Sequence, residues 1–128
     1  MSRLDLGDNI IHYEGSRYLA QALKVNKTLK SLILKLNRID DKGGAKLCND
    51  LMTNNTTLQE LSLAGNSLGE KFCESLAELL MQNKSLKKLD LSCNFITDSS
   101  ASTLQNSLEF TDEEGKGTSV IELDIRNN

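Results

Sequence analysis

The amino-acid sequence predicts an α/β solenoid, with parallel strands along one side and α-helices along the other. A nine-residue pattern, leucine-x-x-leucine-x-leucine-x-x-asparagine, occurs five times, with other residues replacing some of the leucines. Successive copies begin 28, 29, 28 and 34 residues apart, a period typical of stacked repeats. The residues between the copies repeat as well, so chance does not explain the pattern. The five copies span residues 1–9, 29–37, 58–66, 86–94 and 120–128.

Each copy predicts one short strand followed by an inward turn. In the fourth copy, LKKLDLSCN, Leu89 and Leu91 alternate with polar residues, as in a half-buried strand. An asparagine then closes the copy, where the turning chain leaves backbone groups unpaired. A buried amide carries both a donor and an acceptor, so a stacked column of amides is expected to satisfy those groups. The column consists of Asn9, Asn37, Asn66, Asn94 and Asn128.

A helix is expected after each strand. Leucines fall ten and fourteen residues after the asparagine, and a small or adaptable residue falls seven after it. These intervals of three and four residues define one apolar helical stripe. Neither layer buries its apolar side alone, so neighbouring repeats must stack. In the third repeat Phe72 occupies a slot that holds glycine in the first two, and it should push the turn outward or pack on the neighbouring helix.

The turns between helix and strand are rich in asparagine: VNKT, TNNTT and QNKS. Asparagine tolerates the left-handed backbone that ends many helices, which is the reason we expect it there. The same turns contain four glycosylation sequons, an alternative interpretation that implies secretion. Because the sequons recur in register, turn chemistry is the favoured interpretation. Their asparagines are Asn26, Asn54, Asn55 and Asn83.

This pattern resembles the ribonuclease-inhibitor-like class of leucine-rich repeats across essentially the whole chain. The resemblance implies a leucine-rich repeat solenoid, or horseshoe, with strands on the concave side and helices on the convex side. The expected domain is single (1–128), with four repeats (1–28, 29–57, 58–85, 86–119) and a final strand (120–128). Three runs (34–52, 89–94 and 120–128) look most like the leucine-rich-repeat subunit of the axonemal dynein regulatory complex, the t-complex testis-expressed group. That likeness implies a non-catalytic scaffold in motile cilia.

Composition argues against several function classes. The net charge of −3 and the pI near 5.2 argue against a nucleic-acid partner or an anionic membrane surface. No apolar run is long enough to cross a membrane, and no signal peptide is visible, which favours a cytoplasmic location. The odd number of cysteines and their spacing argue against disulfides and metal sites and favour structural thiols in a reducing compartment. They are Cys48, Cys73 and Cys93.

A search for catalytic chemistry finds no constellation of reactive side chains. His12 is the only histidine, and no serine or cysteine lies in a nucleophile pattern. The segment 112–118, DEEGKGT, lacks the spacing of a phosphate-binding loop and the alternation of a calcium loop. It is interpreted as a solvated insertion of about six residues. We therefore expect no catalytic residue, metal, cofactor or small-molecule substrate.

The candidate site is the concave face. Leucines point into the core, so the third, fifth and seventh motif positions face the other side. The third-position column places Glu60, Lys88 and Glu122 side by side. Their charges either neutralise one another across the strands or contact a charged partner. Apolar Ile33 and Leu36 are expected to form an apolar spot with a basic rim. The candidate partner-binding residues are Arg3, Asp5, Ser31, Ile33, Lys35, Leu36, Arg38, Glu60, Ser62, Lys88, Asp90, Glu122, Asp124 and Arg126.

The sequence favours a protein-binding scaffold that is a subunit of a larger hetero-complex. Met1 and Leu4 occupy core slots that nothing covers, so the chain is expected to belong to a longer array. One alternative is a GTPase-activating or other regulatory module of the cytosol, similar to the Ran activator, with Arg38 as the exposed arginine after a strand. A second alternative is a secreted or surface recognition domain, which predicts glycans on the turn asparagines.

Overall fold

The computed structural model describes residues 2–128, without the side chains of Met52 and Asn54. The expectation that Met1 fills a core slot therefore lies outside the described residues. Strands and helices alternate along the chain, as the repeat predicts. The elements are β1 (Arg3–Asp5), α1 (His12–Val25), β2 (Ser31–Ile33), α2 (Asp41–Asn54), β3 (Glu60–Ser62), α3 (Glu70–Gln82), β4 (Lys88–Asp90), α4 (Asp98–Glu109) and β5 (Glu122–Asp124).

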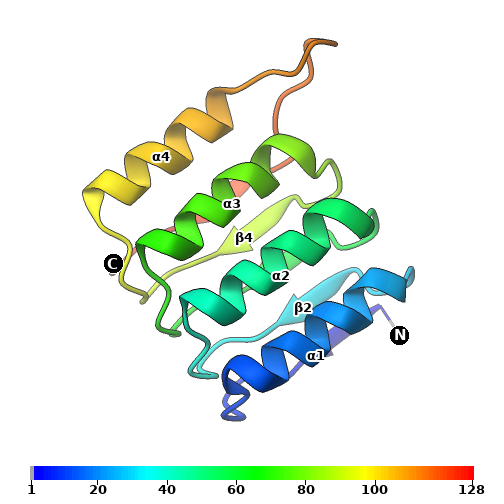
Figure 1. The fold of residues 1–128 in the computed structure, drawn as a ribbon, viewed down its shortest axis with the longest axis vertical. Helices are drawn as coiled ribbons and strands as arrows, with labels where there is room; N and C mark the ends of the chain where they lie inside the picture. The colour runs from blue at the N-terminus through cyan, green and yellow to red at the C-terminus, as the bar shows by residue number, and fades with distance from the viewer. Residues whose placement is uncertain (1) are drawn as a thin grey trace.

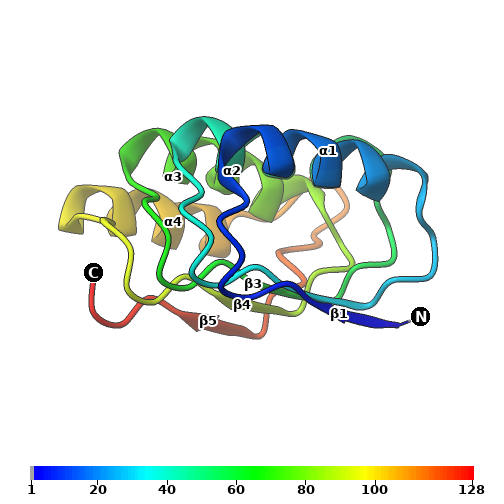
Figure 2. The ribbon, with the colours of Figure 1, turned by 90° about the horizontal axis from the view of Figure 1, so that it is seen from below.

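The strands form one parallel sheet in the order β1-β2-β3-β4-β5. The central motif leucine of each strand pairs with its counterpart on the next, so the register of the sheet is that of the repeat. Helices α1 to α4 lie side by side as a second layer over one face of the sheet (Figures 1 and 2). The opposite face of the sheet carries no helix. These observations confirm the α/β solenoid. The paired leucines are Leu4, Leu32, Leu61, Leu89 and Leu123.

The core lies between the two layers. Leu61 and Leu89 point into it from the sheet, and both are buried. The helices contribute the leucines ten residues after each motif asparagine, among them Leu47, Leu76 and Leu104, which are also buried. Strand and helix leucines thus share one aliphatic cluster. Its burial is the main source of stability for a stack of short strands.

The motif asparagines form the expected column along the strand ends. In the interior of the stack, the Asn66 side-chain oxygen accepts hydrogen bonds from the N–H groups of Asn37 and Ile39, each 3.0 Å long. Its amide nitrogen donates to the carbonyl oxygen of Leu34 in the preceding repeat and to that of Leu63 in its own. Asn66 itself is buried. The column therefore satisfies backbone groups that the strands leave unpaired.

The helix-to-strand turns also use asparagine, but the expected reason is wrong. Asn26, Asn55 and Asn83 have φ values of −74°, −110° and −78°, so their backbones are extended rather than left-handed. Instead, each side-chain oxygen accepts hydrogen bonds from the N–H groups two and three residues later. Such a turn holds the chain before it enters the next strand.

Two of these turn amides also connect repeats. The Asn55 side chain donates to the carbonyl oxygen of Leu23, and that of Asn83 donates to the carbonyl oxygens of Leu51 and Asn55. Both asparagines are buried. The side-chain oxygen of each accepts hydrogen bonds within its own turn, and the side-chain nitrogen donates to the preceding repeat. These bonds agree with the interpretation that the asparagines are there to form the turns rather than to carry glycans.

Phe72 packs on the neighbouring helix and does not push its own turn outward. Its side chain is fully buried. Gly44 of α2 provides the space, since a Cβ atom at that position would lie 2.6 Å from Cδ1 of Phe72 and 2.7 Å from Cδ2 of Leu68. The large residue in α3 and the small residue in α2 are therefore matched across the helix interface.

Replacing Gly44 with alanine is expected to lower the free energy of unfolding by about 1–3 kcal/mol, because the added methyl group overpacks the core. Gly43→Ala is the matched control. A Cβ there meets Ser16 Oγ at 3.0 Å, a milder contact. Both changes raise helix propensity equally. Urea unfolding would compare the two variants, and equal stabilities would contradict the Phe72–Gly44 match.

The insertion before the last strand is exposed but ordered by hydrogen bonds (Figure 1, orange segment after α4). The N–H of Asp112 donates to the carbonyl oxygen of Lys116, and the Asp112 side chain accepts from the N–H groups of Glu114 and Lys116. Lys84, in the turn before β4, donates to the carbonyl oxygen of Gly117 and lies 3.8 Å from the Asp112 carboxylate. The segment is thus a self-contained turn with one lysine attached to it.

Deleting residues 111–116 restores the 28-residue spacing and is expected to cost less than about 1 kcal/mol. The deletion removes two solvent-accessible ion pairs, Lys84–Asp112 and Glu114–Lys116, and no buried apolar side chain. Loop length itself has little effect on stability. Thermal unfolding of the shortened chain would test this expectation. A loss of several kcal/mol would mean that the segment supports the stack.

Candidate protein-binding face

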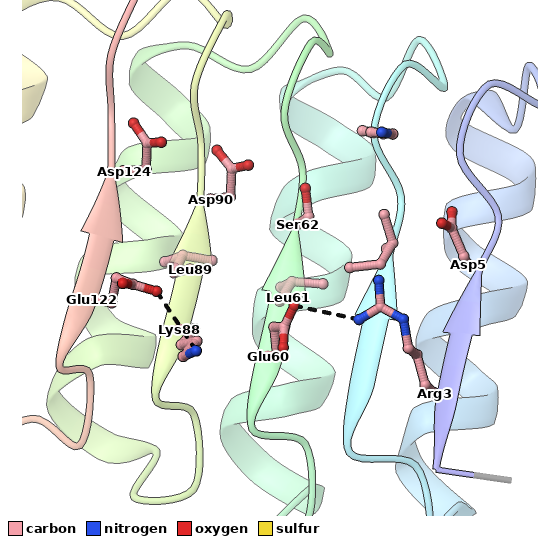
Figure 3. Close-up of a pocket in the computed structure, with 12 residues that line it drawn as sticks. Arg3, Asp5, Glu60, Leu61, Ser62, Lys88, Leu89, Asp90, Glu122 and Asp124 are labelled. Carbon is pink, nitrogen blue, oxygen red and sulfur yellow. Dashed lines mark ion pairs between the residues drawn. The ribbon is translucent and has the colours of Figure 1, made fainter.

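The concave face of the sheet forms a shallow trough of about 490 Å³ (Figure 3). The third and fifth motif positions of all five strands point toward it, as predicted, except that Ser31 lies beneath its neighbours. Figure 3 shows the labelled charged side chains on the same face of the sheet. The trough brings together ten candidate residues, which are Arg3, Asp5, Ile33, Lys35, Glu60, Ser62, Lys88, Asp90, Glu122 and Asp124.

The third-position column largely neutralises itself. Lys88 and Glu122 are in register on β4 and β5, and their charged atoms lie 3.9 Å apart. Glu60 pairs with Arg3 at 3.6 Å, although β2 lies between their strands. Figure 3 marks both ion pairs. These residues are more than a third exposed, so each pair contributes little to stability.

The Arg3 side chain crosses β2 on the concave side. On its way to Glu60 it donates a hydrogen bond of 3.1 Å to Ser31 Oγ. Ser31 is consequently buried. The next residue on the same side of β2, Ile33, is also only 7% exposed. The expectation of an exposed apolar spot at Ile33 is therefore wrong, because Ile33 is buried.

The fifth-position column is acidic toward the C-terminal strands. Asp90 and Asp124 are in register on β4 and β5. Arg126 donates to both oxygens of Asp124, at 3.0 and 2.8 Å, and these bonds lower the pKa of Asp124 and raise that of Arg126. Asp90 instead accepts from the N–H and the hydroxyl of Ser92. Its charge is not neutralised by an ion pair within residues 2–128.

Lys35 is the corresponding unpaired cation on the N-terminal half of the trough. Its aliphatic stem lies along Gly7, where a Cβ atom would be 3.1 Å from Lys35 Cγ. Among the described residues its ammonium group makes neither an ion pair nor a hydrogen bond. Lys35 and Asp90 therefore present opposite charges that the trough itself does not satisfy.

Leu36 and Arg38 lie outside the trough, on the turns that lead from strand to helix. Both are exposed, and both have a left-handed backbone, with φ of 57° and 56°. Leu36 lies over Gly65 of the next repeat, whose Cβ position would be 2.7 Å from Leu36 Cδ2. The structure thus separates Leu36 from Ile33, and the expected cluster of the two does not form.

Sequence reasoning missed two other apolar residues on this edge. Ile10 and Phe95 each follow a motif asparagine directly, and they are 55% and 68% exposed. The signal was available in the sequence, because the equivalent positions of the second and third repeats hold Arg38 and Ser67. Because the position directly after the motif asparagine is polar in the other repeats, an apolar side chain there is expected to be exposed to solvent.

Two of the three cysteines are buried and one is exposed. Cys48 and Cys73 are buried, and burial raises the pKa of both, to about 11 for Cys73. Cys93 is exposed. All three are free thiols. Buried thiols with raised pKa values are poor nucleophiles, so these two are structural.

Residues 2–128 contain no group of three or more His, Cys, Asp or Glu side chains placed to hold a metal ion. Across the same residues, every helix is too short or too polar to cross a membrane.

The stacked strand–turn–helix units define a solenoid repeat protein with a polar concave face. The family described as Leucine Rich repeat matches residues 25–48, 54–77 and 82–104, more than half of the chain. The chain belongs to this leucine-rich repeat family. A domain of this family implies a protein–protein interaction module.

Curated relatives support the ribonuclease-inhibitor-like class. Ribonuclease inhibitor of Sus scrofa is 39% identical over 93 residues, covering 73% of this chain and 20% of that protein. NACHT, LRR and PYD domains-containing protein 14 of Mus musculus is 37% identical over 94 residues, covering 73% of this chain and 10% of that protein. The chain therefore spans a fifth or less of the length of these relatives.

Solved structures share the fold. Leiomodin-1 Actin-Binding Site 2 superposes with a TM-score of 0.84 at 20% identity, covering 98% of this chain and 70% of that one. The tropomodulin C-terminal domain of Caenorhabditis elegans gives a TM-score of 0.69 at 20% identity, covering 91% and 65%. At this identity the likeness shows a common architecture alone.

Proposed function

We propose that this chain is a non-catalytic scaffold that binds a partner protein in its concave trough, as one subunit of a hetero-complex. The observation that carries the proposal is the distribution of charge in the trough. Arg3 is paired with Glu60 and Lys88 with Glu122, whereas Asp5, Lys35 and Asp90 make no ion pair among the described residues.

This distribution suits recognition of a protein surface. Paired charges already satisfy each other, so a partner that covers them leaves no isolated charge behind. Lys35 lies two residues after β2 and Asp90 is the last residue of β4. Their strands are two spacings apart, or about 10 Å across the sheet, and the two residues are offset along the strands. A partner that sets a carboxylate against Lys35 and a cation against Asp90 gains two complementary contacts. Complementary charges of this kind fix specificity and register more than affinity.

The strand-to-helix edge extends the proposed surface beyond the trough. Ile10 and Leu36 are exposed apolar side chains on adjacent repeats. Arg38, two residues after Leu36, is also exposed and makes no ion pair among the described residues. Apolar anchors beside a cation are typical of the residues that carry binding energy in protein interfaces.

For the assembly, we propose a cytoplasmic complex of motile cilia. The support is the likeness of residues 34–52, 89–94 and 120–128 to the leucine-rich-repeat subunit of the axonemal dynein regulatory complex. A scaffold with a polar concave face suits such an assembly, because it needs no catalytic group. This part of the proposal is tested separately from the binding face.

The binding face is tested with a charge-reversal pair. The tagged chain, its Lys35→Glu/Asp90→Lys variant and a control variant would be expressed in multiciliated epithelial cells and cross-linked in place. The control reverses Lys71 and Glu78, which are exposed on α3 in the helix layer. Both double variants keep the net charge, so only the location of the change differs.

We expect the wild-type chain and the α3 control to cross-link to the same proteins through the concave strands, and the trough variant to lose those cross-links. Equal cross-linking of all three chains would reject the trough as the binding face. Immunofluorescence of the wild-type chain tests the compartment, and a signal away from axonemes would reject the ciliary assignment alone.

A further inference from the structure

The chain between α4 and β5 contains three hydroxyl residues, which differ in the hydrogen bonds that their side chains make. Ser119 donates to the carbonyl oxygen of Leu86 at 2.6 Å, and Thr118 Oγ1 accepts from the N–H of Val120 at 3.2 Å. Thr111 is exposed, and its hydroxyl makes no hydrogen bond within residues 2–128. Thr111 alone of the three thus presents a free hydroxyl group.

Three carboxylate residues follow Thr111 directly. Asp112 accepts the N–H groups of Glu114 and Lys116, which lower the pKa of its carboxyl group and hold it ionised. Glu113 is exposed and makes no ion pair among the described residues. Glu114 lies 3.8 Å from Lys116, with 77% of its side chain exposed. The acceptor hydroxyl is therefore followed by accessible negative charge at the second and third positions.

The spacing of a hydroxyl residue three positions before a carboxylate is common in this chain, but only at Thr111 are all three following residues carboxylates. Thr57 Oγ1 is buried, and Ser75 lies within α3. Ser67 forms a parallel bridge with Asp40. The carbonyl group of Ser2 pairs with the N–H groups of Lys30 and Ser31, and Ser119 is engaged as described. Of these positions, Thr111 is the exposed one that three consecutive carboxylate residues follow.

We propose that Thr111 is a phosphorylation site for an acidophilic serine/threonine kinase, one that recognises carboxylates on the C-terminal side of the acceptor. Kinases select substrates by such charge patterns. In the reaction, Oγ1 of Thr111 attacks the γ-phosphorus of ATP. The bond from that phosphorus to the β–γ bridging oxygen breaks, ADP leaves, and the hydroxyl proton is released.

The surroundings of Thr111 define what the phosphate would contact. Thr111 Cγ2 lies 3.8 Å from the Cβ position of Gly117, and the Gly117 carbonyl oxygen accepts from Lys84 Nζ. Thr111 and Lys84 thus meet at Gly117. A phosphate is a stronger acceptor than the Asp112 carboxylate that Lys84 now pairs with, so the modification should recruit Lys84. The segment then gains negative charge and a firmer attachment to the third repeat.

The test uses the purified chain with Mg²⁺-ATP and an acidophilic kinase, and in parallel a basophilic kinase that requires arginine before the acceptor. Mass spectrometry would locate the phosphate. We expect one phosphate on Thr111 from the acidophilic enzyme and none there from the basophilic enzyme. Thr111→Val should abolish incorporation. Glu113→Gln/Glu114→Gln should slow it about tenfold or more, since both recognised charges are removed.

Two controls separate the site from the fold. Ser67→Ala/Ser75→Ala should leave the rate unchanged, because each of these serines is followed by a single carboxylate at the third position rather than by three in a row. All three altered residues in the test variants are exposed, so circular dichroism should show unchanged folding. Phosphate on other residues, or equal rates for wild type and the double glutamine variant, would overturn the proposal. So would modification of a synthetic 107–117 peptide without modification of the intact chain.

Discussion

Replacing Leu89 with alanine is expected to lower the free energy of unfolding by about 2–5 kcal/mol, the usual cost of deleting a buried leucine side chain. Leu89 is 2% exposed in β4 and is in register with Leu61 and Leu123 of the neighbouring strands. The cavity would therefore open between three repeats, and the loss should spread to both neighbours, because a solenoid is stabilised repeat against repeat.

Urea unfolding measures the size of this loss, and amide hydrogen exchange measures its spread. Val25→Ala is the matched control, since Val25 is 78% exposed and its removal should change stability little. Faster exchange in β3 and β5 as well as β4 is expected for Leu89→Ala. A urea midpoint close to that of the control would mean that Leu89 does not fill the core.

Replacing Asn94 with alanine is the second change expected to have a large effect, about 3 kcal/mol or more. The Asn94 side chain accepts from the N–H groups of Asn66 and Leu68, and donates to three carbonyl oxygens, including that of Leu63. Alanine would leave these groups unpaired in a buried turn, and each costs about 1–3 kcal/mol when left unsatisfied.

Asn9→Ala is the control for this change. The Asn9 amide nitrogen donates to the carbonyl oxygens of Leu6 and Gly7 of its own turn, in an exposed position, so its loss should cost less than about 1 kcal/mol. Asn94→Asp should not rescue stability, because its second carboxylate oxygen would face three carbonyl oxygens. Thermal unfolding of the three variants would test the series. Equal losses at Asn9 and Asn94 would contradict a structural role for the column.

The fold was predictable because the same residue pattern recurs in every repeat. Leucine alternation identifies the strands, intervals of three and four identify the helices, and the asparagines identify the strand ends. The pattern recurs in five copies, so one residue that departs from it does not obscure the repeat. Phe72 is such a residue, and it changes one packing contact without changing the architecture. The insertion has no repeat to serve as its template, and the attachment of Lys84 to Gly117 could not be inferred.

The candidate face was predictable in its positions but not in its pairings. The motif placed Glu60, Lys88 and Glu122 in one column, and the register confirms it. That Arg3 would reach across β2 to Glu60 depends on side-chain length and sheet curvature, which no pattern encodes. The burial of Ile33 was not predicted either. The role of these residues in binding a partner stays a prediction.

The asparagine column couples each interior repeat to both of its neighbours. The side-chain oxygen of Asn37 holds the N–H of Asn9, and that of Asn66 holds the N–H groups of Asn37 and Ile39. The amide nitrogens of the same asparagines donate to carbonyl oxygens of the preceding repeat, Asn37 to Leu6 and Asn66 to Leu34. Fraying of one repeat therefore removes hydrogen bonds from the repeats on both sides of it. Local opening should spread in both directions along the stack, and a partner that binds one strand should also slow the opening of the turns next to it.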